Sequence, residues 1–313
     1  MHRLGRYRLL AGVVLLLGIL GATAYWVKHH DERPDRQTDS APVGPIAPER
    51  SCAHLPAFLR KQHIAQPVMI DLSQKHYKGI AFRYGRNFGD ILHLKQWEQY
   101  EHFGTYALDR MGNIYLIPTP YISIRPTTFA LQRKLYRLDS QTGRLEIFMN
   151  LESVQPSQNN PYGLNAIAYD CDDDTLWVAT IDRSDYRTQR GVLHHIDLRR
   201  RAVLSTYAGF DALSLAIAHT PHGKYLLAGS ARDNSLYAFA LDATQQLQQP
   251  QRLFSLPDPN QHIRKIKLVD AHTMQIESIR FTYALIAQTA RQDRLRFVAK
   301  WDKTRQKWHI KPQ

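Results

Sequence analysis

A four-strand unit that recurs along the chain constrains the fold more than any other feature. Each unit opens with a short apolar strand, a tight polar turn and a second apolar strand, as in residues 106–117. Two strands of alternating apolar and polar residues follow, as in residues 134–148. One such sheet cannot bury both of its faces alone, so successive units pack face to face. Repeats of about 50 residues with this pattern predict a β-propeller.

Five such units can be traced, and they predict an all-β propeller of five or six four-stranded blades. A degenerate first unit covers residues 79–94, and residues 69–72 either complete it or close the ring with the last blade. A β-sandwich, which does not require a repeat, is the competing architecture. In the three later units the inner strand pairs are expected at 166–179, 215–228 and 266–276, and the outer pairs at 192–207, 235–254 and 281–298.

The first 27 residues are expected to lie outside the propeller. Arg3, Arg6 and Arg8 precede an apolar run over residues 9–27, and about 19 apolar residues are long enough to span a bilayer. A small-residue site ending at Ala24 also fits cleavage by signal peptidase. The segment therefore predicts a single-pass anchor in the inner membrane with the C-terminal domain in the periplasm, or a soluble periplasmic protein cleaved after Ala24.

The stretch from residue 28 to residue 50 is charged and rich in proline, with few large apolar side chains. Such a segment buries too little surface to offset its chain entropy, so we expect a disordered linker before a domain at 51–313. The chain has two cysteines, Cys52 and Cys171. An even cysteine count in an exported chain predicts a disulfide between them.

The charge of the chain is strongly positive and is concentrated near the C-terminus. The net charge is +13, and residues 262–313 hold twelve Lys or Arg and four Asp or Glu, a net +8. A basic surface attracts anionic partners. We expect the partner to be an envelope protein or an anionic polymer, and we do not favour nucleic acid.

The inner strands resemble those of the NHL and SMP-30/gluconolactonase-like propellers. The resemblance is carried by residues 162–170 with 176–179, and by residues 215–218 with 225–229. It implies a propeller fold and, for the lactonase branch, a divalent metal held in the channel by a Glu, an Asn and an Asp. Asn165 stands near the position of that Asn, but no matching Glu or Asp is found. The sequence therefore favours a non-enzymatic binding scaffold without catalytic residues, metal or cofactor; a metal-dependent, lactonase-like hydrolase is the alternative.

Long loops follow the second strand of two successive units, and they carry aromatic and basic residues. Function concentrates on loops that a rigid scaffold holds, and Tyr and Arg dominate binding hot spots. Because both loops follow the second strand of their blade, we expect them on one face of the propeller. The candidate binding residues are Tyr121, Arg125, Asn165, Asp182, Arg183, Tyr186 and Arg190.

Overall fold

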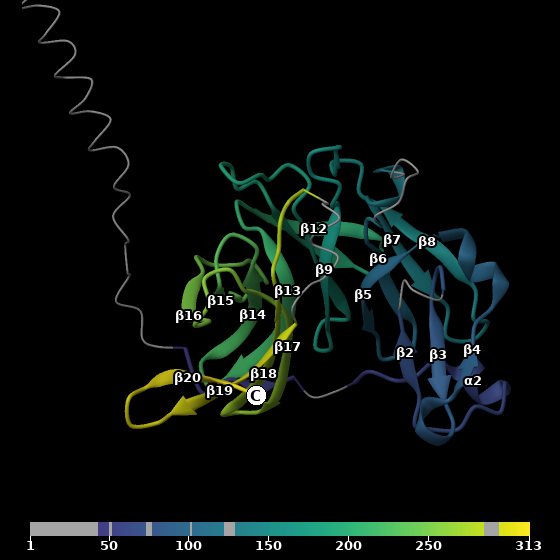
Figure 1. Ribbon diagram of the computed structural model, residues 1–313, viewed down its shortest axis with the longest axis horizontal. Coiled ribbons are helices and arrows are strands. Elements are labelled where there is room, and N and C mark those ends of the chain that lie inside the picture. Colours follow the sequence, from purple (N-terminus) through teal and green to yellow (C-terminus); the bar gives the residue numbers. More distant parts are fainter. Residues whose placement is uncertain (1–42, 50–51, 73–76, 101, 122–128, 285–293) are drawn as a thin grey trace, which may run out of the picture. The chain divides into compact units, whose positions relative to one another are not determined.

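Antiparallel sheets make up most of the folded chain. The computed structural model describes residues 43–49, 52–72, 77–100, 102–121, 129–284 and 294–313. These residues form five sheets, which follow one another in chain order around a common centre (Figure 1). The predicted all-β propeller is confirmed, with five blades.

The strands of each blade follow in sequence, and we number the blades in chain order. Blade 1 has three strands and the other blades have four, with the short strand β1 (Ala47–Pro48) added beside β13 in blade 4. The strands are β2 (Met69–Asp71), β3 (Ala81–Tyr84) and β4 (Asp90–Leu92) in blade 1; β5 (Phe103–Leu108), β6 (Ile114–Pro118), β7 (Lys134–Leu138) and β8 (Leu145–Asn150) in blade 2; β9 (Leu164–Asp170), β10 (Thr175–Thr180), β11 (Val192–Asp197) and β12 (Ala202–Ala208) in blade 3; β13 (Ala212–Thr220), β14 (Gly223–Ser230), β15 (Ser235–Ala240) and β16 (Gln251–Ser255) in blade 4; and β17 (His262–Asp270), β18 (Thr273–Ile279), β19 (Leu295–Asp302) and β20 (Lys307–Pro312) in blade 5.

The second strand of each middle blade is buried on both faces, which explains its continuous apolar sequence. Neighbouring residues of a strand point to opposite faces. Leu176 therefore packs toward blade 2 while Trp177 packs toward blade 4. Hydrophobic clusters built in this way fill the four interfaces between successive blades. They include Phe82 with Leu116, Tyr115 with Leu176, Trp177 with Leu226, and Leu227 with Ile276.

An aspartate begins the turn between the third and fourth strands in each of blades 2 to 5. In every case one carboxylate oxygen accepts hydrogen bonds from backbone N–H groups two to four residues further on, which holds the turn closed. These hydrogen bonds lower the pKa of the carboxyl in blades 2, 4 and 5. The four aspartates are Asp139, Asp197, Asp242 and Asp302.

Residues 43–49 and 52–64, which we call the strap, contact the blades in reverse order, beginning with blade 5. Val43 and Ile46 are buried in the core between blades 4 and 5. Trp308 of blade 5 donates a hydrogen bond through Nε1 to the carbonyl oxygen of Val43 at 3.2 Å. Ala47 pairs with His219 at the end of β13. These residues fall within the range predicted as a linker, so the folded domain begins before residue 50.

The second part of the strap reaches blades 3, 2 and 1. Cys52 forms a disulfide with Cys171 of blade 3, which confirms the predicted bond. The backbone N–H of His54 then donates to Asp109 of blade 2 at 3.3 Å. The short helix α2 (Ala57–Lys61) follows, and Phe58 packs edge-on against Phe82 of blade 1. The strap thus joins all five blades at the end where the first and second strands turn.

Two details of the predicted strand order need correction or completion. Residues 69–72 belong to blade 1, because β2 pairs with β3. Residues 281–284 were expected to begin the third strand of the last blade, but they form no strand. The outer strands of blade 5 are β19 and β20 instead, and they are joined by a hairpin turn at residues 303–306 that the sequence pattern did not predict.

The predicted localisation is also corrected. The apolar segment at 9–27 lies outside the described residues. In the part of the chain that the structure describes, no helix is long and apolar enough to cross a membrane. Such a helix takes about 20 residues, and α2 has five. On this finding the predicted inner-membrane location is wrong, whereas the disulfide is typical of proteins from an oxidising compartment.

Candidate functional site

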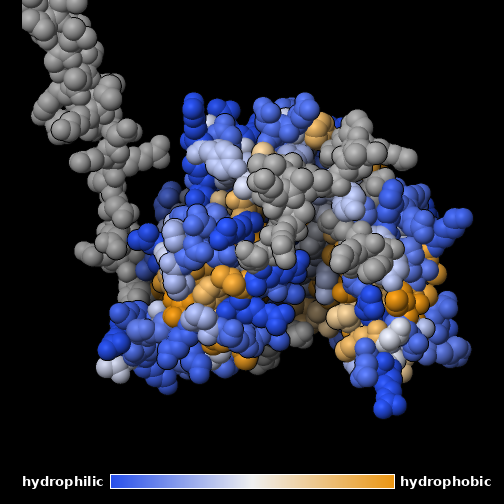
Figure 2. Space-filling model, viewed as in Figure 1, coloured by the Kyte–Doolittle hydropathy of each residue, from blue (hydrophilic) through white to orange (hydrophobic). Residues whose placement is uncertain are grey.

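One end of the propeller gathers the long loops, and we call it the loop face. Neighbouring strands run in opposite directions, so the loop after the second strand and the link into the next blade emerge at the same end. The described parts of the loop face are residues 119–121 and 129–133, 151–163, 181–191, 209–211, 231–234, 256–261 and 280–284. Figure 2 shows mainly hydrophilic residues on the visible face of the molecule, with smaller hydrophobic groups among them.

The loop after β10 is tied to the link that enters blade 3. Asp182 accepts a hydrogen bond from the backbone N–H of Gln155 at 2.7 Å. Arg183 donates through Nη2 to the carbonyl oxygen of Ser153 at 2.7 Å. The buried amide of Asn160 donates to two backbone carbonyls of the loop, at 2.6 and 2.8 Å. Asp182 and Arg183, both predicted as binding residues, therefore hold the two loops together.

Asp211 connects loops of three blades through one buried carboxylate. Its Oδ1 accepts hydrogen bonds from the Ser184 hydroxyl at 2.5 Å and from the backbone N–H of Gly191 at 2.7 Å, both in blade 3. Its Oδ2 accepts from the Tyr283 hydroxyl of blade 5 at 2.5 Å. Burial raises the pKa of Asp211, and the hydrogen bonds from Ser184 and Tyr283 oppose that rise. The carboxylate fixes the relative positions of the loops before any partner binds.

Five aromatic side chains on this face are connected by ring contacts, and we call them the aromatic row. Tyr186 is 63% exposed and meets Tyr283 edge-on at 5.6 Å between ring centroids. Tyr283 contacts Phe281 at 5.2 Å, and Phe281 contacts Tyr162 at 5.4 Å and His262 at 6.2 Å. The row therefore runs from an exposed tyrosine in blade 3 to buried and half-buried rings in blade 5.

Arg264 places a positive charge at the centre of the propeller. Its side chain leaves β17 and donates to the carbonyl oxygen of Leu213 at 2.7 Å and to that of Gly104 at 3.5 Å, on the first strands of blades 4 and 2. No carboxylate of the described residues forms an ion pair with it. Burial lowers the pKa of Arg264, and the nearby Tyr162 opposes that shift. A buried cation without an acidic partner is costly, so this charge is available to an anion.

The channel residues do not fit the metal site of a lactonase. Asn165 is buried, and its amide nitrogen donates to the carbonyl oxygen of Ala212 at 2.9 Å, which joins blades 3 and 4. Arg264 brings a guanidinium to the centre, where it would repel a divalent cation. Asn165 therefore has a structural role here, and we derive no step through a metal.

The other predicted binding residues have separate surroundings. Tyr121 is 44% exposed and stacks against His102 at 4.3 Å between ring centroids. Arg190 is exposed, and its backbone N–H donates to the hydroxyl of Ser184 at 2.9 Å. Arg125 lies outside the described residues. Asp182, Arg183, Tyr186 and Arg190 lie in the one loop between β10 and β11, and their role in binding stays a prediction.

A group of acidic and basic side chains lies at the opposite end, beside the strap. Glu49, Asp172 and His219 can bring three ligand atoms within 4.8 Å of one another. Lys224 shares this space: it pairs with Asp170 at 2.8 Å, lies 3.9 Å from Asp172 and also contacts Asp173. The ammonium group already neutralises part of the acidic turn that follows β9.

The stability of the protein should depend on the ionisation of Glu49. Burial, then the charges of Asp170 and Asp172, raise the pKa of Glu49 to about 7 from its ordinary value of 4.5. The folded state then binds more protons than the unfolded state between about pH 4.5 and pH 7. The free energy of unfolding should fall as the pH rises through this window, by about 1–2 kcal/mol because Glu49 is only half-buried.

Glu49→Gln should remove this part of the pH dependence, since the amide oxygen can still accept the N–H of Cys171. Melting temperatures at pH 5 and pH 8 test the expectation: the variant should gain stability over the wild type only at pH 8. Glu152→Gln, which removes an exposed carboxylate, is the control. If the melting temperature changes between pH 5 and pH 8 by the same amount in the variant as in the wild type, the assignment to Glu49 is contradicted.

Residues that sequence reasoning missed carry much of this site. Asp211 lies in a short link between blades, and Arg264 occupies a strand in which charged and apolar residues alternate. Tyr283 and Phe281 were placed in a strand. No local sequence signal indicates Asp211. The structure shows that a Cβ at Gly191 would come within 2.4 Å of Asp211 Oδ1, so the position opposite Asp211 needs a glycine.

Comparisons with known proteins give only distant structural likenesses. No family model and no curated protein matches the sequence. A solved structure of a luciferin-regenerating enzyme is 13% identical over 75% of this chain and 70% of its own, with a TM-score of 0.42. A glucose dehydrogenase is 14% identical over 72% and 78%, with a TM-score of 0.42. A functionally unknown protein from Desulfotomaculum acetoxidans DSM 771 is 14% identical over 79% of both chains, with a TM-score of 0.41. Membership of the NHL or SMP-30 families is not confirmed, and no activity is transferred from these proteins.

Proposed function

We propose that the chain is a non-enzymatic binding propeller whose loop face holds an acidic group of a protein or polymer partner. The observation that carries this proposal is Arg264, a cation at the centre of the propeller that forms no ion pair with a described carboxylate. Burial lowers the pKa of Arg264, although the charge of Glu277 acts to raise it. Carboxylate groups form the strongest pairs with guanidinium groups, because both are planar and charged.

The surroundings of Arg264 suit a partner rather than a reaction. Tyr162 and the rest of the aromatic row lie between Arg264 and the exposed Tyr186, so rings can exclude water from an incoming acidic group. Arg183 and Arg190 add exposed positive charge on the same loop. Catalysis would need a nucleophile or a positioned acid–base pair, and the hydrogen bonds of Asp182 and Asp211 commit both carboxylates to holding loops.

The loop face is also fixed in advance, which favours tight binding. Asp211 joins blades 3 and 5. Asp182 and Asn160 join the link that enters blade 3 to the loop that follows β10. A surface that is already ordered loses little conformational entropy when a partner binds. Support from three blades therefore favours a rigid binding surface over a lid that closes.

Titration with glutarate, a small dicarboxylate, tests the role of Arg264 through tyrosine fluorescence and calorimetry. Arg264→Gln should weaken binding by about tenfold to a hundredfold, because a hydrogen bond to a charged group contributes about 1.5–3 kcal/mol. Tyr186→Ala should weaken binding of larger acidic partners by about tenfold and leave the melting temperature unchanged, since the side chain is exposed.

Arg199→Gln is the matched control, because it removes the same charge from an exposed turn at the opposite end of blade 3. If it weakens glutarate binding as much as Arg264→Gln does, net charge explains the effect and the proposal fails. Wild-type protein that does not bind glutarate would also count against it.

A further inference from the structure

Blade 5 has one face packed in the core and one face that is exposed. Met274, Ile276 and Phe297 point toward blade 4 and are buried there. Residues directly opposite each other on neighbouring strands share a face. In the strand register, Lys265 lies opposite Glu277, and Glu277 lies opposite Arg296. By the same register the exposed face also receives Lys267, Gln275, Val298, Lys311 and Lys300.

The exposed face carries more positive charge than its own acids neutralise. Its exposed cations, which we call the cation ladder, are Lys265, Lys267, Arg296, Lys300 and Lys311. Two carboxylates reach the same face: Glu277 pairs with Arg294 at 3.4 Å, and Asp302 lies 3.3 Å from His309. In the described part of the chain, no ion pair joins either carboxylate to the ladder.

This arrangement attracts an anion. No member of the ladder lies directly opposite another Lys or Arg, but several positive charges on one face raise the local positive potential and repel one another at longer range. An anionic partner would relieve that repulsion on binding. A second copy of this chain does not fit the ladder, because each copy carries a net charge of +13.

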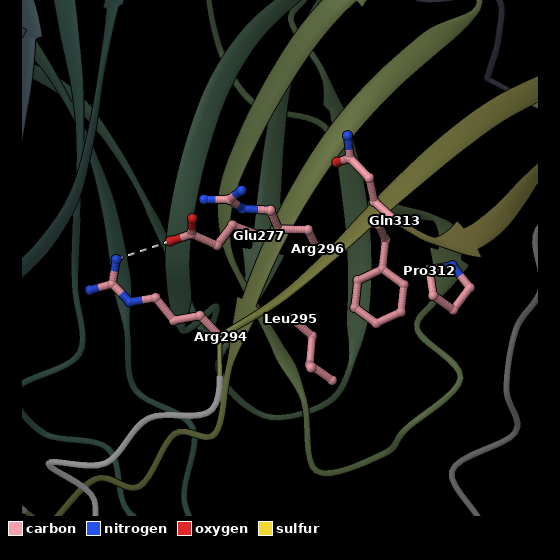
Figure 3. Close-up of a pocket in the computed structure, with 7 residues that line it drawn as sticks. Glu277, Arg294, Leu295, Arg296, Pro312 and Gln313 are labelled. Atoms are coloured by element: carbon pink, nitrogen blue, oxygen red, sulfur yellow. Dashed lines mark hydrogen bonds and ion pairs between the residues drawn. The ribbon is translucent and has the colours of Figure 1, made fainter. Parts of the chain in front are cut away.

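A pocket at the start of β19 borders the cation ladder at Arg296, and its apolar walls belong to the other face of the sheet, since Phe297 points toward blade 4 and is paired with Pro312. Its volume is about 430 Å³, which lies within the range of ligand pockets of about 300–1,000 Å³. Leu295, Phe297 and Pro312 contribute apolar walls. Figure 3 shows Arg296 beside the Glu277–Arg294 pair, with Leu295 and Pro312 lower in the view. The pocket therefore combines an apolar floor with a cationic rim.

The combination decides which kind of anion fits. A nucleic acid or a sulfated polysaccharide has no apolar side chain for the pocket, and single strands usually stack their bases on aromatic residues. Among the cross-strand neighbours of the ladder, which are Glu277, Gln275, Val298, Thr273 and His309, His309 alone has a ring, and it lies 3.3 Å from Asp302. A polypeptide can supply both carboxylates and an apolar anchor residue within a few positions.

We infer that the outer face of blade 5 binds an acidic peptide segment of a protein partner. Carboxylates of the segment contact the cation ladder, and an apolar side chain of the same segment enters the pocket between Leu295 and Pro312. The pocket lies at the loop-face end of blade 5, where the charges of Arg294 and Glu277 also act on Arg264, while the cation ladder extends along the outer face of the blade. The inference rests on the ladder and the pocket and not on the role proposed for Arg264.

The test uses the full chain and a fluorescein-labelled peptide of six glutamates followed by one phenylalanine, with binding followed by fluorescence anisotropy. Wild-type protein should bind, and binding should weaken as salt is raised. Arg296→Gln should weaken binding at least fivefold, and Leu295→Ser should have an effect of similar size. Lys303→Gln, which removes an exposed charge from the turn of the same blade, should change binding less than twofold.

Peptide variants separate the two parts of the surface. Replacing the phenylalanine by alanine should weaken binding about tenfold, and replacing the glutamates by glutamines should abolish it. Tyr186→Ala should leave peptide binding unchanged, because Tyr186 lies in the loop after β10 of blade 3. The inference is overturned if Lys303→Gln weakens binding as much as Arg296→Gln does. It is also overturned if the alanine peptide binds equally well, or if heparin binds and the peptide does not.

Discussion

Replacing Asp211 by alanine is expected to lower the free energy of unfolding by about 3–5 kcal/mol, because it breaks a buried charged network. The change removes the acceptor for Ser184, Gly191 and Tyr283, all of which lie in the interior of the loop face. Each donor left without an acceptor costs about 1–3 kcal/mol when water cannot reach it. Denaturant unfolding of the variant against wild type measures the loss.

Two further variants make this expectation specific. Asp211→Asn keeps an oxygen for Ser184 and Gly191 but presents an N–H group to Tyr283, so its loss should be intermediate. Asp185→Ala removes an exposed carboxylate that accepts hydrogen bonds only from its own loop, and it should cost less than about 1 kcal/mol. A loss below about 1 kcal/mol for Asp211→Ala would show that the three loops are held by other contacts.

Removal of the Cys52–Cys171 disulfide is expected to cost on the order of 4–5 kcal/mol in the chain-entropy model. The bond closes a loop across 119 positions of sequence, and it holds the strap to blade 3. The double variant Cys52→Ser, Cys171→Ser avoids leaving a free thiol, and denaturant unfolding under identical buffer conditions gives the difference. A reducing agent should destabilise the wild type by a similar amount and leave the double variant unchanged.

The control for this experiment lies in the same part of the molecule. Glu49 accepts a hydrogen bond from the N–H of Cys171 and would still hold the strap weakly after the sulfur atoms are lost. Adding Glu49→Ala to the double variant removes this acceptor and separates its contribution. If the double variant unfolds at the same denaturant concentration as wild type, the packed strap, with Ile46 and Phe58 buried, is sufficient without the bond.

The propeller could be predicted because its repeat depends on local patterns. Pairs such as Leu176 and Trp177 are apolar at every position, which indicates strands buried on both faces, whereas β12 alternates. The prediction failed for the outer strands of blade 5, where a long insertion separates β18 from β19. The turn aspartate gives a better signal: Asp302 begins the last turn just as Asp139 begins the turn of blade 2.

The candidate site was harder to predict, since its contacts join distant parts of the sequence. Asp211 meets Tyr283 across 72 positions, and Arg264 reaches Gly104 across 160. Neither residue has a local pattern that distinguishes it from an ordinary link or an outer strand. Tyr186 and Arg183 were found because exposed aromatic and basic residues in a long loop are a local signal. The strap residues Val43 and Ile46 were missed because a short apolar pair within a Pro-rich stretch resembles a linker.

The strap also constrains the order in which the chain can fold. Val43 receives its hydrogen bond from Trp308, 265 positions later, and Ile46 donates to Ala271. A ribosome delivers the strap first and its docking surface last, so these apolar residues must wait for the final blade before they are buried. Contacts of such long sequence separation slow folding and extend the time during which apolar surface is exposed. Efficient maturation of this protein should therefore depend on protection of its N-terminal part during synthesis.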